Sequence, residues 1–106
     1  MKLDRLPVES LGHWLERAEG WRLEEDKWIV KSYRFRTFPE AVAFVQSIAS
    51  VAEQELNHHP FIAIDYRIVR LRLTTWHAGG LTELDFEAAH RFDQIYWKSE
   101  AAAPLN

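Results

Sequence analysis

Two adjacent histidines before a proline form the motif in this 106-residue chain that is best suited to chemistry: Asn57-His58-His59-Pro60. A neutral imidazole has a reference pKa of about 6.5, so it can donate or accept a proton near neutral pH. Adjacent residues do not share a helix face, so the pair lacks the i, i+4 spacing of helical metal ligands. A structural role is the alternative, because the helix dipole favours a histidine at a helix C-terminus. The motif alone leaves both interpretations open.

Three more candidates, Thr75, Trp76 and His77, follow one another at the end of a predicted strand. Strand alternation places Trp76 and His77 on opposite faces unless a bulge intervenes. Trp76 is either an edge packing residue or a flat surface for a planar ring. Asp85 comes three residues after Thr82, which is the spacing of a capping box and thus a structural role. A carboxylate can also orient an imidazole, and the two roles do not exclude each other.

Together, these residues resemble the signature of the pterin-4a-carbinolamine dehydratase family, also called 4a-hydroxytetrahydrobiopterin dehydratase. The spacing agrees with the signature, since five residues separate Pro60 from Tyr66 and nine separate Tyr66 from Trp76. Eight more residues separate Trp76 from Asp85. Two positions depart from the family pattern: Trp76 stands where the best-known members have a third imidazole, and Gln54 stands where an acidic residue is usual. The resemblance covers most of the chain.

The resemblance implies a hydro-lyase that dehydrates 4a-hydroxytetrahydropterin to quinonoid dihydropterin by histidine acid–base catalysis, as a step of tetrahydrobiopterin recycling. No metal and no cofactor are implied. The implied catalytic residues are His58, His59 and Asp85. The implied pterin-binding residues are Asn57, His58, His59, Thr75, Trp76 and His77. We expect His58 and His59 at the mouth of a pocket that Asp85 and Trp76 also line.

The resemblance also implies partners. These are a small-molecule pterin, a second copy of the chain in a homodimer or a dimer of dimers, and a functional link to an aromatic amino-acid hydroxylase. The alternative is a non-catalytic binding, assembly or coactivator protein on the same fold, because some relatives act in that way. Retention of His58, His59 and Asp85 favours the enzyme, whereas Trp76 favours the alternative. A metal site that joins His77 to the two histidines is disfavoured by strand alternation.

The composition excludes several classes of protein. Hydrophobic residues make up 47% of the chain and include five Trp, which excludes a disordered chain. A net charge of -3 lacks the basic excess of a nucleic-acid-binding domain. The absence of cysteine excludes a thiolate nucleophile, a disulfide and a Cys-based zinc site. The first ten residues lack the apolar core of a signal peptide and no apolar run approaches a membrane span, so we expect a cytoplasmic protein without membrane contact.

The hydrophobic pattern predicts the elements that must position these side chains. The expected helices and strands are Pro7–Ala18 (helix), Trp21–Glu24 and Trp28–Phe35 (strands), Thr37–Asn57 (helix), Phe61–Tyr66 and Ile68–Trp76 (strands), and a last helix from Thr82. The order α-β-β-α-β-β-α predicts an α+β class, with an antiparallel four-stranded sheet and helices packed on one face. We expect a single domain over residues 1–106, with a frayed tail at Ala101–Asn106.

Overall fold

The computed structural model describes residues 3–99, so the tail Ala101–Asn106 lies outside the described residues. Within that range, the elements follow the predicted order. The strands are β1 (Arg22–Glu24), β2 (Trp28–Arg34), β3 (Phe61–Asp65) and β4 (Ile68–Leu73). The helices are α1 (Leu11–Leu15), α2 (Phe38–Val51) and α3 (Glu83–Lys98). Three short turns flank them: the 3-10 turn η1 (Val8–Ser10), the π-helical turn η2 (Ala52–Leu56) and the 3-10 turn η3 (Trp76–Ala78).

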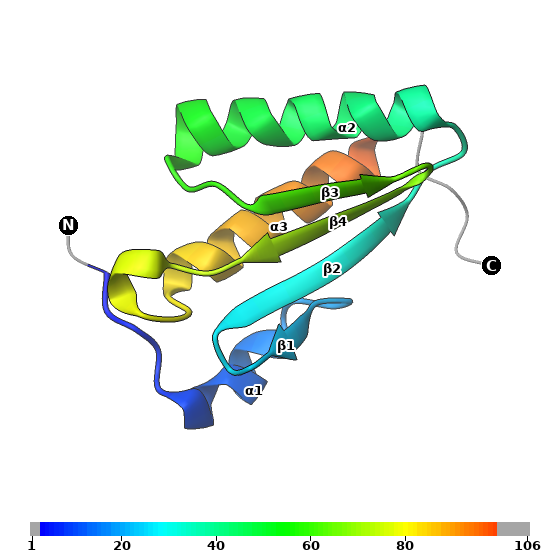
Figure 1. Ribbon diagram of the computed structural model, residues 1–106. Helices are drawn as coiled ribbons and strands as arrows, with labels where there is room; N and C mark the ends of the chain where they lie inside the picture. The colour runs from blue at the N-terminus through cyan, green and yellow to red at the C-terminus, as the bar shows by residue number, and fades with distance from the viewer. Residues whose placement is uncertain (1–2, 100–106) are drawn as a thin grey trace.

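All four strands form one antiparallel sheet in the order β1-β2-β4-β3 (Figure 1). The central pair, β2 and β4, has a register that places Ile29 opposite Leu73 and Tyr33 opposite Val69. β3 follows α2 and η2 along the chain, pairs with β4 and forms one edge of the sheet. The predicted α+β class and the antiparallel four-stranded sheet are therefore confirmed.

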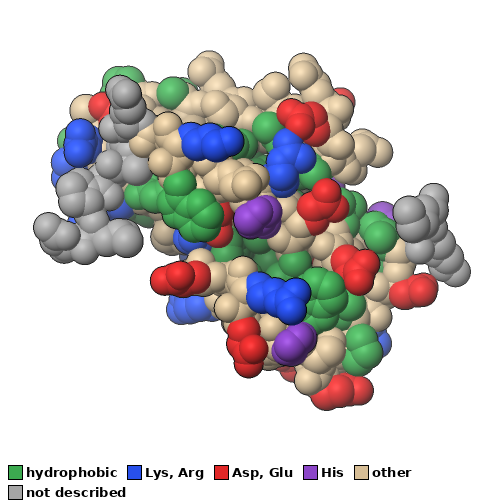
Figure 2. All heavy atoms as spheres, turned by 180° about the vertical axis from the view of Figure 1, so that it is seen from behind, with side chains coloured by type: hydrophobic (Ala, Val, Ile, Leu, Met, Phe, Trp, Pro, Cys, Tyr) green, Lys and Arg blue, Asp and Glu red, His purple; other side chains and the backbone are tan. Residues whose placement is uncertain are grey.

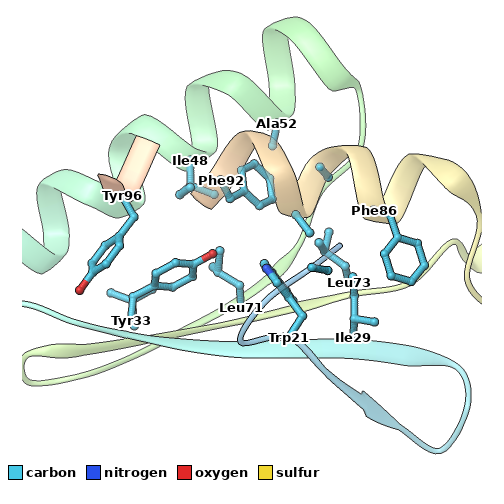
Figure 3. Packing of buried hydrophobic residues seen from close by; sticks show 14 of the residues in the cluster. Trp21, Ile29, Tyr33, Ile48, Ala52, Leu71, Leu73, Phe86, Phe92 and Tyr96 are labelled. Carbon is cyan, nitrogen blue, oxygen red and sulfur yellow. The ribbon is translucent and has the colours of Figure 1, made fainter. Parts of the chain in front are cut away.

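The hydrophobic core lies between the sheet and the two long helices, α2 and α3, which cover one face of the sheet (Figure 3). β4 contributes Val69, Leu71 and Leu73, all fully buried, as the alternation of its sequence predicts. The rings of Tyr33 and Tyr96 pack 5.0 Å apart and join β2 to α3. Since burial of one large apolar side chain contributes about 1.5–3 kcal/mol, this core holds the layers together.

The ends of α2 are set by its sequence. Thr37 Oγ1 accepts a hydrogen bond from Glu40 N at 3.2 Å, and Pro39 stands in the first turn, where a backbone N–H is not needed. At its other end, the helix passes into η2 and stops at Asn57, whose backbone is left-handed with φ 48°. Asparagine adopts this conformation more readily than most residues. The boundaries predicted at Thr37 and Asn57 are confirmed.

The strand predicted over Ile68–Trp76 is too long, because β4 ends at Leu73. Thr75 forms an isolated β-bridge across the following loop, and the next residues turn as η3. Strand alternation therefore does not apply to Trp76 and His77, and both side chains are exposed. The prediction that these two residues lie on opposite faces of a strand was wrong for this reason.

The first helix is also shorter than the predicted Pro7–Ala18. The α-helical part covers only α1 (Leu11–Leu15), with η1 before it. The two ends of the expected apolar face are nevertheless in the core, since Leu11 and Ala18 are both buried. The amphipathic pattern predicted the buried side chains correctly, whereas it overestimated the length of regular helix.

Charges of both signs are interspersed on one side of the molecule. On the side of the molecule shown in Figure 2, Lys and Arg side chains alternate with Asp and Glu side chains. This mixture differs from the basic stripe that is typical of nucleic-acid-binding domains. Among the helices of residues 3–99, none is long and apolar enough to cross a lipid bilayer.

Candidate active site

The predicted site residues gather at one end of the sheet, where the chain passes from η2 into β3 and from β4 into α3. The backbone N–H of His58 donates to the carbonyl oxygen of Ala52 at 3.1 Å, a bond that closes η2. Turns of the π type are rare and are often found at functional sites. This turn and the left-handed backbone of Asn57 direct His58 into the protein and leave His59 at the surface.

His58 and Asp85 form a buried hydrogen-bonded pair. His58 Nε2 lies 2.6 Å from Asp85 Oδ1, and the two side chains are 10% and 0% exposed. Because an ionised carboxylate only accepts hydrogen bonds, the Nε2–H of the ring is the donor. In the neutral imidazole the other ring nitrogen, Nδ1, is then the proton acceptor. The carboxylate thus selects the tautomer of His58 and its orientation.

Two threonines hold the other oxygen of Asp85. Oδ2 accepts a hydrogen bond from the Thr75 hydroxyl at 2.8 Å and one from the backbone N–H of Thr82 at 2.9 Å. The two threonine hydroxyls lie 2.9 Å apart, and Thr82 Oγ1 also accepts from Leu84 N at 3.3 Å. Since Thr75 gives its proton to Asp85, the Thr82 hydroxyl is the donor to Thr75. These bonds form a short chain that ends on the carboxylate beside His58.

Both interpretations of Asp85 therefore hold in the structure. It is the N3 residue of the capping box that begins α3, and it is also the partner of His58. A buried carboxylate is costly unless it is paired and hydrogen-bonded. Here three donors contact it, and it lies in the first turn of a helix, where the dipole favours a negative charge. The local structure at the start of α3 thus holds a charged group against the imidazole.

His59 lies in a different environment from its neighbour. Its Nε2 is 2.8 Å from Glu53 Oε1, and the two side chains are 57% and 73% exposed. An ion pair this open to water contributes little to stability. His59 is thus oriented at the surface, next to the buried pair formed by His58 and Asp85.

Three aromatic side chains pack together, and one of them, Trp76, stands where the best-known members of the family have a third imidazole. Trp76 is 70% exposed and packs edge-on against Trp28, with ring centroids 5.3 Å apart. The ring of Phe61 lies 5.2 Å from Trp28 and 6.2 Å from Trp76. The guanidinium of Arg72 stacks over Trp28 at 4.2 Å. We call Trp28, Phe61 and Trp76 the aromatic cluster; it offers flat apolar surface at the end of the sheet.

Two pockets adjoin the aromatic cluster. One of about 440 Å³ includes Phe61 in its wall, and one of about 130 Å³ includes Trp28 and Trp76. Neither is lined by His58 or Asp85, so a single cavity shared by the histidines, Asp85 and Trp76 stays a prediction. Of the residues expected to bind the pterin, two are buried, His58 and Thr75. The exposed ones are Asn57, His59, Trp76 and His77.

The residues that sequence reasoning missed are Trp28 and Phe61 beside Trp76, and Glu53 beside His59. Phe61 directly follows the histidine motif, so its position was a usable signal. Trp28 begins β2, and its meeting with Trp76 depends on the loop after β4, which the sequence did not reveal. Glu53 lies six residues before His59, and this spacing brings side chains together only across a π turn and a left-handed residue.

No three His, Asp or Glu side chains within residues 3–99 converge in a way that could hold a metal ion. His58 and His59 contact separate carboxylates, Asp85 and Glu53, rather than a common point. The disfavoured metal hypothesis with His77 therefore gains no support from the geometry.

A second buried carboxylate, Asp93, has a structural role apart from the candidate site. It accepts hydrogen bonds from Trp21 Nε1 at 3.2 Å, Lys31 Nζ at 2.8 Å and the Tyr33 hydroxyl at 2.6 Å. Burial and the negative charge of Asp93 raise the pKa of Tyr33 far above its ordinary value. Trp21, which the sequence left open between core and site, is 4% exposed and belongs to the core.

Comparison with known proteins agrees with the resemblance. The family model described as pterin 4 alpha carbinolamine dehydratase matches residues 4–95. A Sinorhizobium fredii protein named for pterin-4-alpha-carbinolamine dehydratase is 45% identical over 95 residues, which cover 89% of this chain and 90% of that protein. A Chloroflexus aggregans protein named for the same enzyme is 44% identical over 91 residues, which cover 86% of this chain and 96% of the relative.

Two solved structures share the fold. A transcriptional coactivator/pterin dehydratase from Brucella melitensis is 31% identical, with a TM-score of 0.80 over 87% of this chain and 98% of that one. A pterin dehydratase-like protein described as a RuBisCO assembly factor in the alpha-carboxysome is 24% identical, with a TM-score of 0.63 over 76% of this chain and 94% of that one. The second likeness concerns the fold alone. On the family match over residues 4–95 and the close relatives along most of its length, this chain belongs to the pterin 4 alpha carbinolamine dehydratase family.

Proposed function

We propose that this protein is a hydro-lyase that converts 4a-hydroxytetrahydropterin into quinonoid dihydropterin and water. The observation that carries the proposal is the buried contact of 2.6 Å between His58 and Asp85, inside the region, residues 4–95, that the family model matches. A buried imidazole with a carboxylate on one nitrogen is a common arrangement for proton transfer. The names of the relatives support the same activity.

The reaction needs only proton transfers. The substrate carries a hydroxyl on C4a and a hydrogen on the neighbouring nitrogen, N5. The lone pair on nitrogen helps to break the C4a–O bond, a proton goes to the departing oxygen to form water, and the N5 proton is removed. Acid–base assistance by positioned side chains contributes about 10²–10⁴-fold to such a step.

In this proposal, His58 transfers the proton through Nδ1, the ring nitrogen that Asp85 does not contact. Asp85 stabilises the imidazolium that forms while His58 holds the proton. Thr75 is fully buried and donates to Asp85, so we assign it a positioning role rather than direct contact with the pterin. Its hydroxyl keeps the carboxylate aimed at the ring.

The exposed residues of the site then bind the substrate. His59 and Asn57 present polar groups beside the buried pair, and Trp76 presents a ring face on which the pterin can stack. His77 lies in η3 directly after Trp76 and is a further candidate for contact with the pterin. A functional link to an aromatic amino-acid hydroxylase is part of the proposal, since that class of enzyme produces the carbinolamine.

A non-catalytic role in assembly or as a coactivator is the second candidate. It is favoured by the coactivator role named for the Brucella melitensis neighbour and by Trp76 in place of an imidazole. A binding or assembly protein does not need the buried pair of His58 and Asp85, whereas the proposed enzyme does. The two candidates therefore differ in whether the purified protein accelerates dehydration.

The direct experiment is a dehydration assay. The carbinolamine is generated in solution and its spectrum is followed as quinonoid dihydropterin forms, with and without the purified protein. We expect acceleration that is proportional to protein concentration. A control variant, His13→Ala, removes an exposed imidazole of α1, outside the motif, and is expected to behave like the wild type. No acceleration by well-folded protein would favour the assembly role.

A further inference from the structure

The face of the sheet opposite the helices carries a pocket of about 440 Å³ over β3 and β4. It is lined by Pro60, Phe61, Ile62, Ala63, Arg70 and Arg72. In the antiparallel pairing, Phe61 lies opposite Arg72 and Ala63 lies opposite Arg70, so these four side chains share one face. The pocket therefore combines an aromatic ring, small apolar groups and two guanidinium groups.

The charge of this pocket is of one sign. No Asp or Glu is among its lining residues, and the side chain of Arg70 has no ion-pair or hydrogen-bond partner within residues 3–99. Arg72 is paired with Glu24 through one terminal nitrogen, whereas its Nε is buried and lacks a partner among the described residues. Arg70 therefore offers an unpaired guanidinium to an anion in the pocket, with that of Arg72 as a second positive group in the wall.

The pocket is next to the candidate active site in the chain and in space. Pro60, in the wall of the pocket, directly follows His59. Two residues of chain span at most about 7 Å, so Phe61 lies close to the histidine motif. Phe61 is also a member of the aromatic cluster, 6.2 Å from Trp76. A planar ring on the aromatic cluster can therefore extend a substituent into the pocket.

We propose that this pocket receives a negatively charged substituent of the pterin, a carboxylate or a phosphate on the side chain at C6. The inference rests on the proposed function and names the substrate class that the site prefers. Arginine is suited to this role because its planar fork binds carboxylate and phosphate oxygens in pairs. The volume falls within the range of about 300–1,000 Å³ that is usual for small-molecule sites. In this arrangement Arg70 supplies the unpaired charge and Arg72 a second guanidinium group in the wall of the pocket.

The test compares two stable oxidised pterins as competitive inhibitors of dehydration, 6-carboxypterin, which is anionic, and 6-methylpterin, which is neutral. We expect the wild type to bind 6-carboxypterin about tenfold more tightly, as for one added charge-assisted hydrogen bond. Added salt is expected to reduce this preference, because the pocket is open to solvent. The substrate is the neutral 6-methyl carbinolamine, whichever of the two pterins is the inhibitor.

Arg70→Gln is the informative variant, because it removes the unpaired charge with little change in volume. We expect it to abolish the preference for 6-carboxypterin and to leave binding of 6-methylpterin and turnover of the neutral carbinolamine unchanged. Arg34→Gln is the matched control: it removes a charge from the same face of the sheet, outside the pocket. This control is expected to keep the preference.

The outcomes separate this inference from the proposed function. Equal binding of the two pterins by a wild type that dehydrates the neutral carbinolamine would overturn the anionic preference and leave the lyase standing. An equal loss of preference in Arg70→Gln and Arg34→Gln would also overturn it, since the effect would then be the general charge of the face. A wild-type protein that neither dehydrates the carbinolamine nor binds either pterin would overturn the proposed function. The anionic preference would then fall as well.

Discussion

His58 Nε2 and Asp85 Oδ1 lie 2.6 Å apart although the two residues are 27 positions apart in the sequence. The contact joins the end of α2 to the start of α3, and both residues are positioned by helix termini. The π turn η2 and the left-handed Asn57 aim the imidazole, whereas the capping box aims the carboxylate. Local backbone chemistry at two helix ends thus builds the buried pair of His58 and Asp85.

Replacing the carboxylate by an amide tests the role of Asp85. An Asn side chain is nearly the same size but lacks the charge that stabilises an imidazolium. We expect Asp85→Asn to lower kcat about 10²-fold with little change in KM, and to lower the free energy of unfolding by about 1–2 kcal/mol through the weakened cap. Steady-state kinetics and chemical denaturation give the two values. Glu83→Gln changes an exposed carboxylate in the same helical turn and should leave kcat unaltered.

The hydroxyl of Thr75 offers a test of positioning. Thr75→Val keeps the shape of the side chain and removes the hydrogen bond of 2.8 Å to Asp85. We expect kcat to fall about tenfold while KM changes little, because the lost bond is worth about 1–2 kcal/mol to the carboxylate. Thr75→Ser retains the hydroxyl and should recover most of the activity. If Ser is as impaired as Val, packing rather than the hydrogen bond explains the effect.

Trp76 occupies the position of the third imidazole of better-known relatives. Because its side chain is exposed next to the histidine motif, Trp76→His returns an acid–base group to the site, and we expect activity equal to or above that of the wild type. Trp76→Ala removes the stacking surface without adding a group and should raise KM instead. A Trp76→His variant with turnover as low as that of Trp76→Ala would show that the position does not face the substrate.

Stability at alkaline pH should depend on Tyr33. Its pKa is raised in the folded protein by burial and by Asp93, whereas in the unfolded chain it is about 10. Above that pH the unfolded chain loses the proton and the native protein keeps it, so the free energy of unfolding falls as the pH rises. Below about pH 10 this contribution is fully present. Denaturation at a series of pH values should show a smaller alkaline decline for Tyr33→Phe, and equal declines in the two proteins would contradict the argument.

The edge strand β3 predicts self-association. Its outer backbone groups lie at the edge of the sheet, and Ile62 and Ile64 on this strand are 37% and 39% exposed. An exposed apolar edge of this kind tends to pair with another chain. We therefore expect a dimer at micromolar concentration in sedimentation experiments, and a monomer for Ile64→Lys. A monomeric wild type would contradict the prediction.

The elements that follow strong local rules could be predicted from the sequence. The capping residue Thr37 and the alternation Val69, Leu71, Leu73 predicted α2 and β4, and both exist. Asp85 was predicted as a cap and as a partner of an imidazole, and the structure has both contacts. These cases depend on neighbours within a few residues, where periodicity and capping chemistry decide the conformation.

The parts that depend on tertiary contacts could not be predicted. β4 ends at Leu73, and Thr75 instead forms a bridge to Gly80 across the following loop while its side chain contacts Asp85 and Thr82. No local pattern predicts these contacts. The aromatic cluster similarly joins segments that are far apart in the sequence. The residues around Trp28 therefore do not predict its contacts with Phe61 and Trp76. The π turn η2 also lacks a recognisable signal, although it determines where His58 points.

The most direct test of the account is the rate of carbinolamine dehydration by His58→Ala, measured beside His59→Ala and His77→Ala. The account predicts that His58→Ala lowers kcat by about 10²-fold or more, whereas His59→Ala mainly raises KM, because the exposed imidazole binds substrate rather than transferring the proton. His77→Ala should have a minor effect. Near-normal turnover by a folded His58→Ala protein, with turnover abolished in His77→Ala, would contradict the central role of the pair formed by His58 and Asp85.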